Sequence, residues 1–363
     1  MRLTASKKTL FTAAALSAAL LAAAYAAAYL GPYLPVREAP AGITDMHCHV
    51  AGIGAGGSGA LVSERLRRGP RFALYLRAFG VTAAELEKHG DDLLPARISE
   101  MAERSRFVNK VVILALDGAI GPGGELDAAR TEVYVPNEFA AAAAARHPNL
   151  LFGASVNPYR KDALARLRRA KEQGAVLLKW IPSIMGIDPA DPALAPFYKE
   201  LVRLGLPLLT HAGQERSFSA ARDELGDPER LRLPLKLGVT VIAPHIASTG
   251  VYDGERSTDR LARLMKEFPD LYSDISSLTQ ANKPRYLEEA LTRPEFSGRL
   301  MYGSDFPLIN TPLISPARYY RRVPPRTLLK IIFTRNPLDR DVLLKQHLGV
   351  PPEIFALSGK LFK

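Results

Sequence analysis

Cysteine is almost absent from this sequence, since Cys48 is the only one in 363 residues. A chain with one thiol forms no intrachain disulfide, so a disulfide-stapled scaffold is excluded and pairing says nothing about the redox compartment. The 27 glycines, 28 prolines and 23% charged residues are ordinary for globular proteins, which excludes a disordered, collagen-like or multi-span membrane chain. The length allows one large α/β barrel or two ordinary domains.

A continuous basic stripe interleaved with aromatic residues is also missing. The formal net charge of +11 is spread over short clusters, such as residues 65–68, 166–169 and 318–322. Nucleic-acid-binding surfaces concentrate positive charge along one face, and so we expect no nucleic-acid partner. These clusters are typical of solvated helix faces, with weak attraction to anionic lipid as the alternative.

The amino-terminal segment has no acidic residue before Glu38. Its basic residues are Arg2, Lys7 and Lys8, and they precede an apolar run over residues 10–30. That run is long enough to cross a bilayer as a helix. Because the positive charges precede it, the rest of the chain is expected outside the cytoplasm.

Residues 1–36 therefore form a predicted export or anchoring segment, for which two forms remain open. Small-residue patterns at 22–24 and 26–28 fit cleavage of a signal peptide, whereas an uncleaved helix would tether the protein to the membrane. An alanine-rich amphipathic helix of a soluble protein fits less well, because no polar face interrupts the run. In both forms residues 37–363 make up a second, extracytoplasmic domain.

Short runs rich in Val, Ile and Leu recur after residue 42, each followed by a turn and a segment of helical composition. Eight strands are predicted, at residues 43–50, 110–120, 150–158, 175–182, 206–213, 239–248, 271–278 and 299–308. Helices are predicted between them, at residues 138–146, 161–173, 193–204, 259–268 and 286–292. Eight βα units in about 300 residues favour a single α/β domain, a (β/α)8 TIM barrel, over an open doubly wound sheet.

The longest insertion is predicted between the first two strands, at residues 51–106. It starts as a glycine-rich loop and continues as helices. Its Gly52-x-Gly54-x-x-Gly57 pattern imitates a dinucleotide fingerprint, but the loop runs on before any helix begins, so we expect a loop that covers the site. After Pro337 we expect a C-terminal helix packed outside the barrel.

Ionisable residues cluster at the predicted carboxyl ends of the strands. Asp45, His47 and His49 alternate along the first strand, so their side chains are expected on one face. Three further candidate site residues lie at the predicted carboxyl ends of later strands: His211, His245 and Asp305. Imidazoles and carboxylates that converge at one rim of a barrel suit a catalytic divalent metal, typically zinc.

With these motifs the sequence, from about Gly42 to the C-terminus, resembles the amidohydrolase superfamily, in the branch that contains aminocarboxymuconate-semialdehyde decarboxylase. The motifs are Asp-x-His-x-His at 45–49, Lys-Trp-Ile-Pro at 179–182, Thr-His-Ala-Gly at 210–213, Pro-His at 244–245 and Gly-Ser-Asp-Phe-Pro at 303–307. The resemblance implies one metal held by four residues: His47, His49, His211 and Asp305. It also implies that Asp305 accepts a proton from metal-bound water and that His245 orients this water or polarises the substrate.

Lys179 leaves the number of metals open. If it points inward, the resemblance to binuclear members implies a carboxylated lysine that bridges two metals, with His211 and His245 on the second. The alternative is a plain lysine that neutralises carboxylates or binds an anionic substrate. By strand alternation, Trp180 is expected to pack under a helix and Cys48 to be a buried structural thiol.

Other polar residues near strand ends either contact substrate or hold loops, namely Asp117, Asn157, Asp274 and residues 214–216. The expected function is a metal-dependent hydrolase that activates water to cleave a C–N or C–O bond of a small molecule. One alternative is a metal-dependent decarboxylase or hydratase acting on a small carboxylic acid. Another is an inactive, membrane-tethered binding protein, which the five convergent ionisable groups argue against. The sequence carries no signal for an oligomeric state.

Overall fold

The computed structural model describes residues 5–30, 38–215, 217–218, 221–283 and 285–361. Its centre is a parallel sheet of eight strands in the order β1-β3-β5-β6-β7-β8-β11-β12. The strands are β1 (Ile43–His49), β3 (Val108–Leu114), β5 (Leu150–Ala154), β6 (Leu177–Trp180), β7 (Leu208–Thr210), β8 (Val241–Ala243), β11 (Leu271–Asp274) and β12 (Leu300–Met301). Each lies within or beside a predicted strand.

The sheet closes into a barrel between its first and last strands. The backbone N–H of His49 donates to the carbonyl of Phe306 at 2.8 Å, and that of Met46 donates to Tyr302 at 3.4 Å. Cys48 and Phe306 form a parallel bridge. The predicted TIM barrel is therefore confirmed, and closure brings the ends of β1 and β12 side by side.

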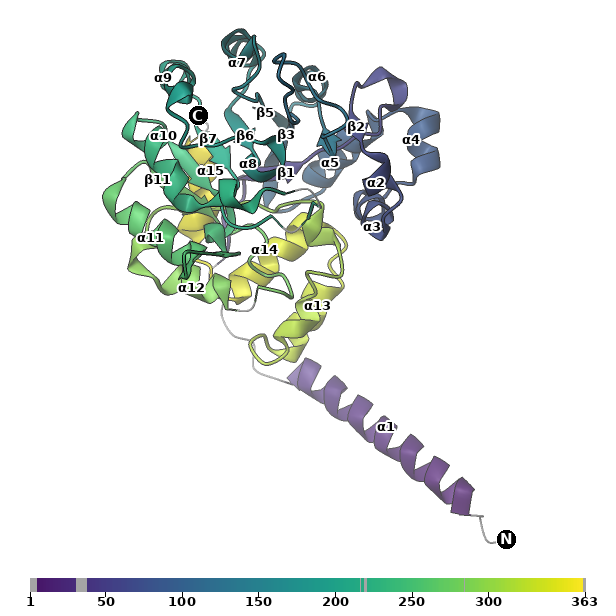
Figure 1. The fold of residues 1–363 in the computed structure, drawn as a ribbon. Helices are drawn as coiled ribbons and strands as arrows, with labels where there is room; N and C mark the ends of the chain where they lie inside the picture. The colour runs from purple at the N-terminus through teal and green to yellow at the C-terminus, as the bar shows by residue number, and fades with distance from the viewer. Residues whose placement is uncertain (1–4, 31–37, 216, 219–220, 284, 362–363) are drawn as a thin grey trace.

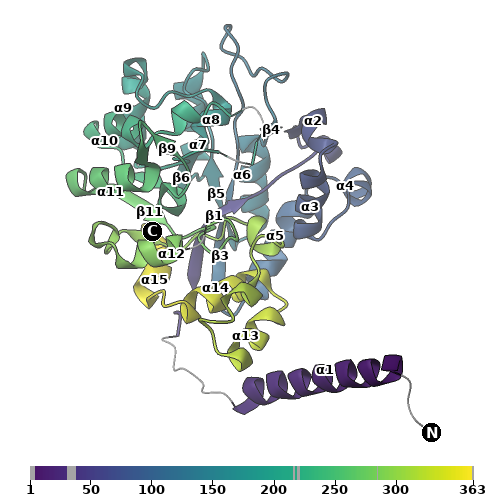
Figure 2. The ribbon, with the colours of Figure 1, turned by 60° about the horizontal axis from the view of Figure 1, so that its bottom comes forward.

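Helices surround this barrel (Figures 1 and 2). Between the strands run α6 (Asn137–Arg146), α7 (Ala163–Glu172), α8 (Pro182–Met185), α9 (Ala195–Leu204), α10 (Arg232–Lys236), α11 (Ser257–Glu267) and α12 (Tyr286–Thr292), and after β12 comes α13 (Pro325–Ile332). Two small antiparallel sheets pair β2 (Leu61–Val62) with β4 (Val133–Tyr134), and β9 (Val251–Tyr252) with β10 (Glu255–Arg256). The helices predicted between the strands are all present.

The insertion after β1 is largely helical, as predicted. It contains α2 (Glu64–Arg67), α3 (Pro70–Phe79), α4 (Ala83–His89) and α5 (Leu93–Glu103). Its glycine-rich start is tied down by Asp91, whose carboxylate accepts the N–H groups of Ile53 and Gly54 at 2.9 Å each. The loop at the start of the insertion is thus anchored to the segment before α5.

The C-terminal segment departs from the expectation of one helix outside the barrel. Two helices follow Pro337, α14 (Pro337–His347) and α15 (Pro352–Leu361). Leu357 and Leu361 of α15 pack against the cluster inside the barrel, and the Ser358 hydroxyl donates to the carbonyl of Thr44 at the start of β1. Helix α15 therefore closes this end of the barrel and shields the apolar side chains inside it from water.

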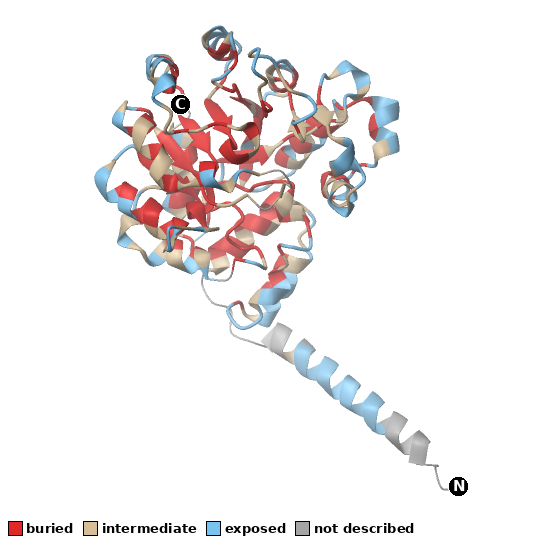
Figure 3. Ribbon diagram, in the orientation of Figure 1, coloured by how far each residue is buried: buried red, intermediate tan, exposed pale blue. Residues whose placement is uncertain are grey.

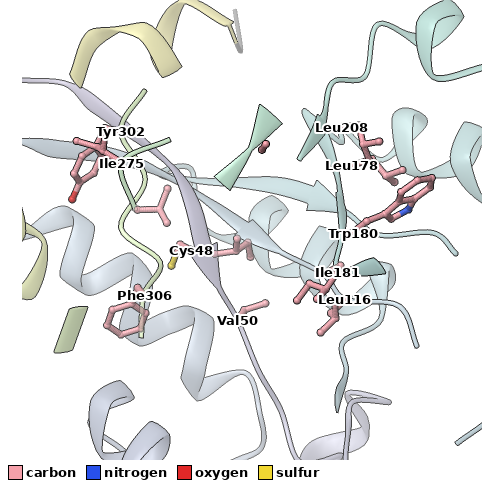
Figure 4. Packing of buried hydrophobic residues seen from close by; sticks show 14 of the residues in the cluster. Cys48, Val50, Leu116, Leu178, Trp180, Ile181, Leu208, Ile275, Tyr302 and Phe306 are labelled. Carbon is pink, nitrogen blue, oxygen red and sulfur yellow. The ribbon is translucent and has the colours of Figure 1, made fainter. Parts of the chain in front are cut away.

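Apolar side chains fill two regions separated by the sheet. The smaller cluster lies inside the barrel and consists of Met46, Val112, Leu114, Leu177, Leu209, Ile242 and Met301. The larger lies between the strands and the surrounding helices, and the strands are buried almost throughout (Figure 3). It includes Cys48 and Trp180, both fully buried, as predicted (Figure 4). Trp180 stacks on Phe197 of α9.

The amino-terminal segment forms α1 (Ala5–Leu30), which projects from the barrel and ends beside α13 (Figures 1 and 2). Leu16, Leu20 and Leu21 on it are 59–72% exposed. Among the residues that the structure describes, no helix has the length and apolarity needed to cross a membrane. The domain limits and the extracytoplasmic location stay predictions.

Candidate metal centre

β1 carries both predicted histidines to the rim of the barrel, but a β-bulge interrupts it. Asp45 pairs with Val111 and Cys48 with Ile113, so three steps along β1 span two along β3. A bulge breaks the alternation of side chains between faces. Asp45 consequently lies apart from the cavity that both histidines line, and the expectation that all three share one face does not hold.

Asp45 has a structural role at the junction of β1 and β12. Its Oδ1 accepts the backbone N–H of Ser304 at 2.8 Å and that of His47 at 3.1 Å. Burial raises the pKa of this carboxyl to about 7, against the lowering effect of these hydrogen bonds. Asp45 thus ties together the two strand ends that carry the predicted ligands.

Three predicted ligands form a compact cluster. The Nε2 atoms of His47 and His49 are 3.2 Å apart, and Oδ1 of Asp305 lies 3.2 Å from His49 Nε2 and 3.7 Å from His47 Nε2. Ligand atoms held ~2.0–2.1 Å from a tetrahedral zinc ion lie ~3.3 Å from one another. The three donor atoms, all within 4.8 Å of one another, therefore fit one divalent ion.

The end of β12 presents Asp305 in a left-handed backbone conformation, with φ of 59°. Its N–H donates to the carbonyl of His47 at 2.7 Å, which offsets part of the strain of that conformation. The Ser277 hydroxyl donates to Oδ2, so Oδ1 faces the histidines. Burial opposes ionisation of Asp305, but the neighbouring imidazoles, that of His47 above all, hold its pKa well below the usual range.

Asp274, at the end of β11, orients His47. Its Oδ2 lies 2.8 Å from His47 Nδ1, so the imidazole carries its proton there and turns the Nε2 lone pair toward Asp305. Burial, and next the charge of Lys179, lowers the pKa of His47 to about 4. The imidazole is therefore neutral at pH 7, which is the form that binds a metal.

The same carboxylate positions the loop of His245. Oδ1 of Asp274 accepts the N–H of His245 at 2.8 Å, and the Ser273 hydroxyl accepts that of Ile246 at 2.9 Å. His245 and Ile246 both have positive φ, a conformation that costs of order 1–3 kcal/mol per residue. These buried hydrogen bonds keep His245 at the rim despite that cost.

Lys179, His211 and His245 complete the polar end of the cavity. Lys179 Nζ lies 3.2 Å from His47 Nε2, and burial lowers the pKa of this amine to about 8. The rings of His211 and His245 lie edge to face, 4.9 Å between centroids. Burial lowers the pKa of both imidazoles, so both are neutral.

His211 Nε2 and His245 Nδ1 are buried and have no hydrogen-bond partner within the described part of the chain. An unpartnered buried nitrogen is costly unless a ligand or ion satisfies it. His211 and His245 lie outside the compact three-residue cluster, but they line the same cavity. Their roles as ligands stay predictions, and the donor set as a whole suits a divalent metal.

Two residues that the sequence left open hold loops. Asp117 forms a buried two-pronged pair with Arg160, at 2.6 and 2.7 Å. The Asn157 amide donates to the carbonyls of Gly118 and Met185. Neither lines the cavity around the cluster, whereas Gln214 and Glu215 do, and Arg216 lies outside the described residues.

Ser277 and Gln280 were not identified from the sequence. The Gln280 amide donates to Ser277 Oγ at 2.9 Å, and Ser277 in turn donates to Asp305. Ser277 lies at the end of the seventh predicted strand and Gln280 just after it, and their distance from residue 305 in the chain hides the contact. The only sequence signal for such a role is the position of Ser277 at the end of a predicted strand, which places it near the rim.

Comparisons with known proteins agree with this architecture. Residues 44–339 match the model of a family described as amidohydrolase. An uncharacterised TIM-barrel protein from Bordetella bronchiseptica superposes with a TM-score of 0.51 at 17% identity, covering 84% of this chain and 99% of its own. That likeness supports the barrel fold. No curated protein sequence matches this chain.

Two further solved structures are similar at lower scores. A probable 2-pyrone-4,6-dicarboxylic acid hydrolase from Acinetobacter baumannii has a TM-score of 0.44 and 15% identity, covering 86% of this chain and 99% of its own. A 5-carboxyvanillate decarboxylase from Sphingomonas paucimobilis has a TM-score of 0.45 and 12% identity, covering 89% of this chain and 99% of its own.

Removing either imidazole of the cluster should remove the metal. We expect His47→Ala and His49→Ala to lose bound divalent metal, because each deletes one of few ligands. Metal per chain, measured by elemental analysis after purification without chelator, tests this. His89→Ala on the exposed end of α4 is the matched control and should keep the wild-type content. Wild-type metal content in both cluster variants would contradict the assignment.

Asp274→Asn should weaken metal binding without deleting a ligand. The amide no longer holds the Nδ1 proton of His47 as a carboxylate does, and loss of such a partner typically costs 10–100-fold in affinity. Competition with a chromogenic chelator measures the dissociation constant. Asp253→Asn, at an 89% exposed side chain, serves as control. An unchanged constant for Asp274→Asn would show that His47 is oriented by other contacts.

Proposed function

This chain belongs to the amidohydrolase family, and on that premise we propose that it is a metal-dependent hydrolase that cleaves a C–N or C–O bond of a small molecule. One observation carries the proposal. His47, His49 and Asp305 place three donor atoms within 4.8 Å of one another at the carboxyl ends of the barrel strands, where TIM-barrel active sites are built.

The metal would be held by His47, His49 and Asp305, with His211 as the fourth predicted ligand. Nitrogen and oxygen donors of this kind suit zinc. A bound divalent ion would supply Lewis acidity, which polarises a carbonyl and makes water more acidic. The second ligand arrangement, two ions bridged by a carboxylated Lys179, is compatible with the 3.2 Å approach of Lys179 to His47.

Asp305 is proposed as the general base. It is ionised, it lies at the rim of the cavity, and Ser277 fixes one of its oxygens. In hydrolysis the attacking water gives a proton to Asp305, which returns it to the departing nitrogen or oxygen. His245, held by Asp274, faces the same cavity and would orient the water or polarise the substrate carbonyl.

Asp305→Asn should reduce turnover by at least about 10²-fold, because an amide accepts no proton from water. Hydrolysis of a panel of esters, lactones and amides measures this, and circular dichroism checks the fold. Asp253→Asn is again the control. Wild-type turnover in Asp305→Asn would contradict the role of general base. Release of carbon dioxide without an acid, alcohol or amine product would identify a decarboxylase, and no turnover by metal-loaded protein would favour a binding protein.

The metal count tests the role of Lys179. If Lys179 carries a carboxyl group, Lys179→Ala should bind about one ion where the wild type binds two, and bicarbonate should help to reconstitute the wild type. The lowered pKa of about 8 leaves part of the amine neutral in mildly alkaline buffer, the form that reacts with carbon dioxide. One ion per chain in fully loaded wild type would leave Lys179 as a plain lysine.

For location, we propose that the barrel lies on the extracytoplasmic side, held at the membrane by its amino-terminal segment or exported after cleavage within residues 1–36. The three basic residues that precede the apolar run support this topology. A reporter fused after Lys363 that works only outside the cytoplasm should be active. Activity of a reporter restricted to the cytoplasm would overturn the topology. Retention of Met1 would identify an anchor, and a new N-terminus a cleaved signal peptide.

A further inference from the structure

The cavity beside the metal-ligand cluster has one polar end and one broad apolar wall. Its volume is about 570 Å³, within the range of pockets that enclose a drug-sized molecule. The insertion between β1 and β3 supplies much of the wall, including Leu66, Phe72, Leu76, Phe79 and Leu94. A substrate of a few polar atoms would leave this wall in contact with water.

Helix α3 shows how the wall is built. Phe72, Leu76 and Phe79 are spaced at four and three residues, so they share one face of the helix, and this face lines the cavity. Phe79 packs edge to face on Phe306, 5.1 Å between ring centroids. Because Phe306 follows Asp305 directly, this contact packs α3 against the segment that carries Asp305.

Besides the metal-ligand cluster, four charged residues line the cavity: Arg71, Lys179, Glu215 and Lys283. Arg71 donates to the carbonyl of Ser217 at 2.7 Å, and Lys179 lies against His47. Glu215 adds a negative charge 3.6 Å from His211. The side chains of Phe72, Leu76 and Phe79 offer no hydrogen-bond donor, so a carboxylate placed against these three would lose its hydration without a partner.

Resting on the proposed hydrolase function, we propose that the substrate is an ester, lactone or amide with an uncharged hydrocarbon or aromatic body of several carbons. The carbonyl lies at the metal-ligand cluster and the apolar body lies along Phe72, Leu76 and Phe79 of α3. Hydrolysis adds water across the acyl C–O or C–N bond, giving a carboxylic acid and an alcohol or amine. The insertion thereby favours substrates whose apolar body covers this wall.

A homologous series of p-nitrophenyl esters from acetate to decanoate tests this proposal. Each added CH₂ is expected to raise kcat/KM about three- to fourfold until the wall is covered. This factor corresponds to the free energy gained when one methylene is transferred from water to an apolar surface. Phe72→Ser should flatten this dependence, and Phe72→Leu should restore it. Ala73→Ser, at an exposed position of the same helix, should behave as wild type.

The outcomes separate this inference from the proposed function. Hydrolysis with no dependence on chain length overturns the apolar substrate class and leaves the hydrolase standing. No hydrolysis of any ester, lactone or amide overturns the hydrolase itself. Binding supplies a readout independent of turnover: 2-decanone should raise the melting temperature of wild type but not of Phe72→Ser, while acetone should raise neither. Equal effects of 2-decanone on both proteins would contradict the assignment of the wall.

A second inference comes from the surface around α13, independently of the cavity. Arg326, Leu329, Lys330 and Phe333 lie three or four residues apart and are exposed on one face, while Leu328 and Ile331 are buried on the other. Phe333 is 77% exposed and Leu329 41%. A face that mixes cations with large apolar groups matches the surface of an anionic bilayer.

The segment before α13 extends this face. Residues 311–338 contain no acidic residue, and Arg321 lies against Tyr320, which is 61% exposed. The carboxyl end of α1 lies beside α13 (Figure 2). We infer that residues 318–335 dock on a membrane that contains anionic lipid, with Phe333 and Leu329 in the headgroup region.

Co-sedimentation of the full chain with vesicles tests this. Wild type should bind phosphatidylcholine–phosphatidylglycerol vesicles more tightly than pure phosphatidylcholine vesicles, and salt should remove the difference. Arg326→Glu with Arg335→Glu should reduce the preference, whereas Lys88→Glu with Lys171→Glu, the same charge change at exposed sites elsewhere, should keep it.

Arg2, Lys7 and Lys8 before the apolar run of α1 also attract anionic lipid, so the contribution of the basic face is read from the Arg326 and Arg335 variant compared with the Lys88 and Lys171 variant. Phe333→Ser should weaken binding to both vesicle types. Equal binding of wild type to the two compositions, or an unchanged preference in the Arg326 and Arg335 variant, would overturn the inference. Tighter binding to duplex DNA than to vesicles would identify the face as a nucleic-acid surface instead.

Discussion

The hydrogen bonds of one buried carboxylate, that of Asp274, organise the candidate site. One oxygen fixes the tautomer and orientation of His47, and the other holds the strained loop that presents His245. Burial opposes its ionisation, yet the adjacent His47 keeps its pKa below the usual value. An ionised carboxylate in a barrel interior is stable only if its oxygens are satisfied, and here the groups that satisfy them belong to the site. Structural stability and metal binding are therefore coupled through one side chain.

Closure of the barrel supplies the second requirement. His49 and Met46 of β1 reach the residues after β12 through backbone hydrogen bonds, and Asp45 adds a side-chain contact to Ser304. These contacts bring Asp305 to the two histidines. The bulge in β1 removes Asp45 from the cavity and assigns it to this junction, while both histidines remain at the rim. A strand with regular alternation would have directed three charged or polar groups to one point.

The rim of the barrel and the insertion after β1 contribute different kinds of side chain to the site. The rim residues come from strand ends of the barrel and provide the polar chemistry, whereas the insertion after β1 provides an apolar wall that meets them at Phe79 and Phe306. Helix α13 and its neighbours form another surface with both positive charge and exposed apolar groups. An enzyme that rests on a lipid surface and takes substrates with apolar bodies would use both features together.

The sequence by itself determined the barrel, its eight strands and the residues His47, His49 and Asp305, because hydrophobic periodicity and motifs at strand ends are local properties. It also placed Trp180 and Cys48 in the core by simple alternation. The bulge at Asp45, the support of Asp305 by Ser277 and Gln280, and the closure of the barrel by α15 were decided only by the tertiary structure. Each of these joins residues far apart in the chain or depends on a one-residue shift in register, and neither leaves a periodic signal in the sequence. The apolar wall, too, exists only because α3 folds back over the rim, where its buried face meets the end of the last strand.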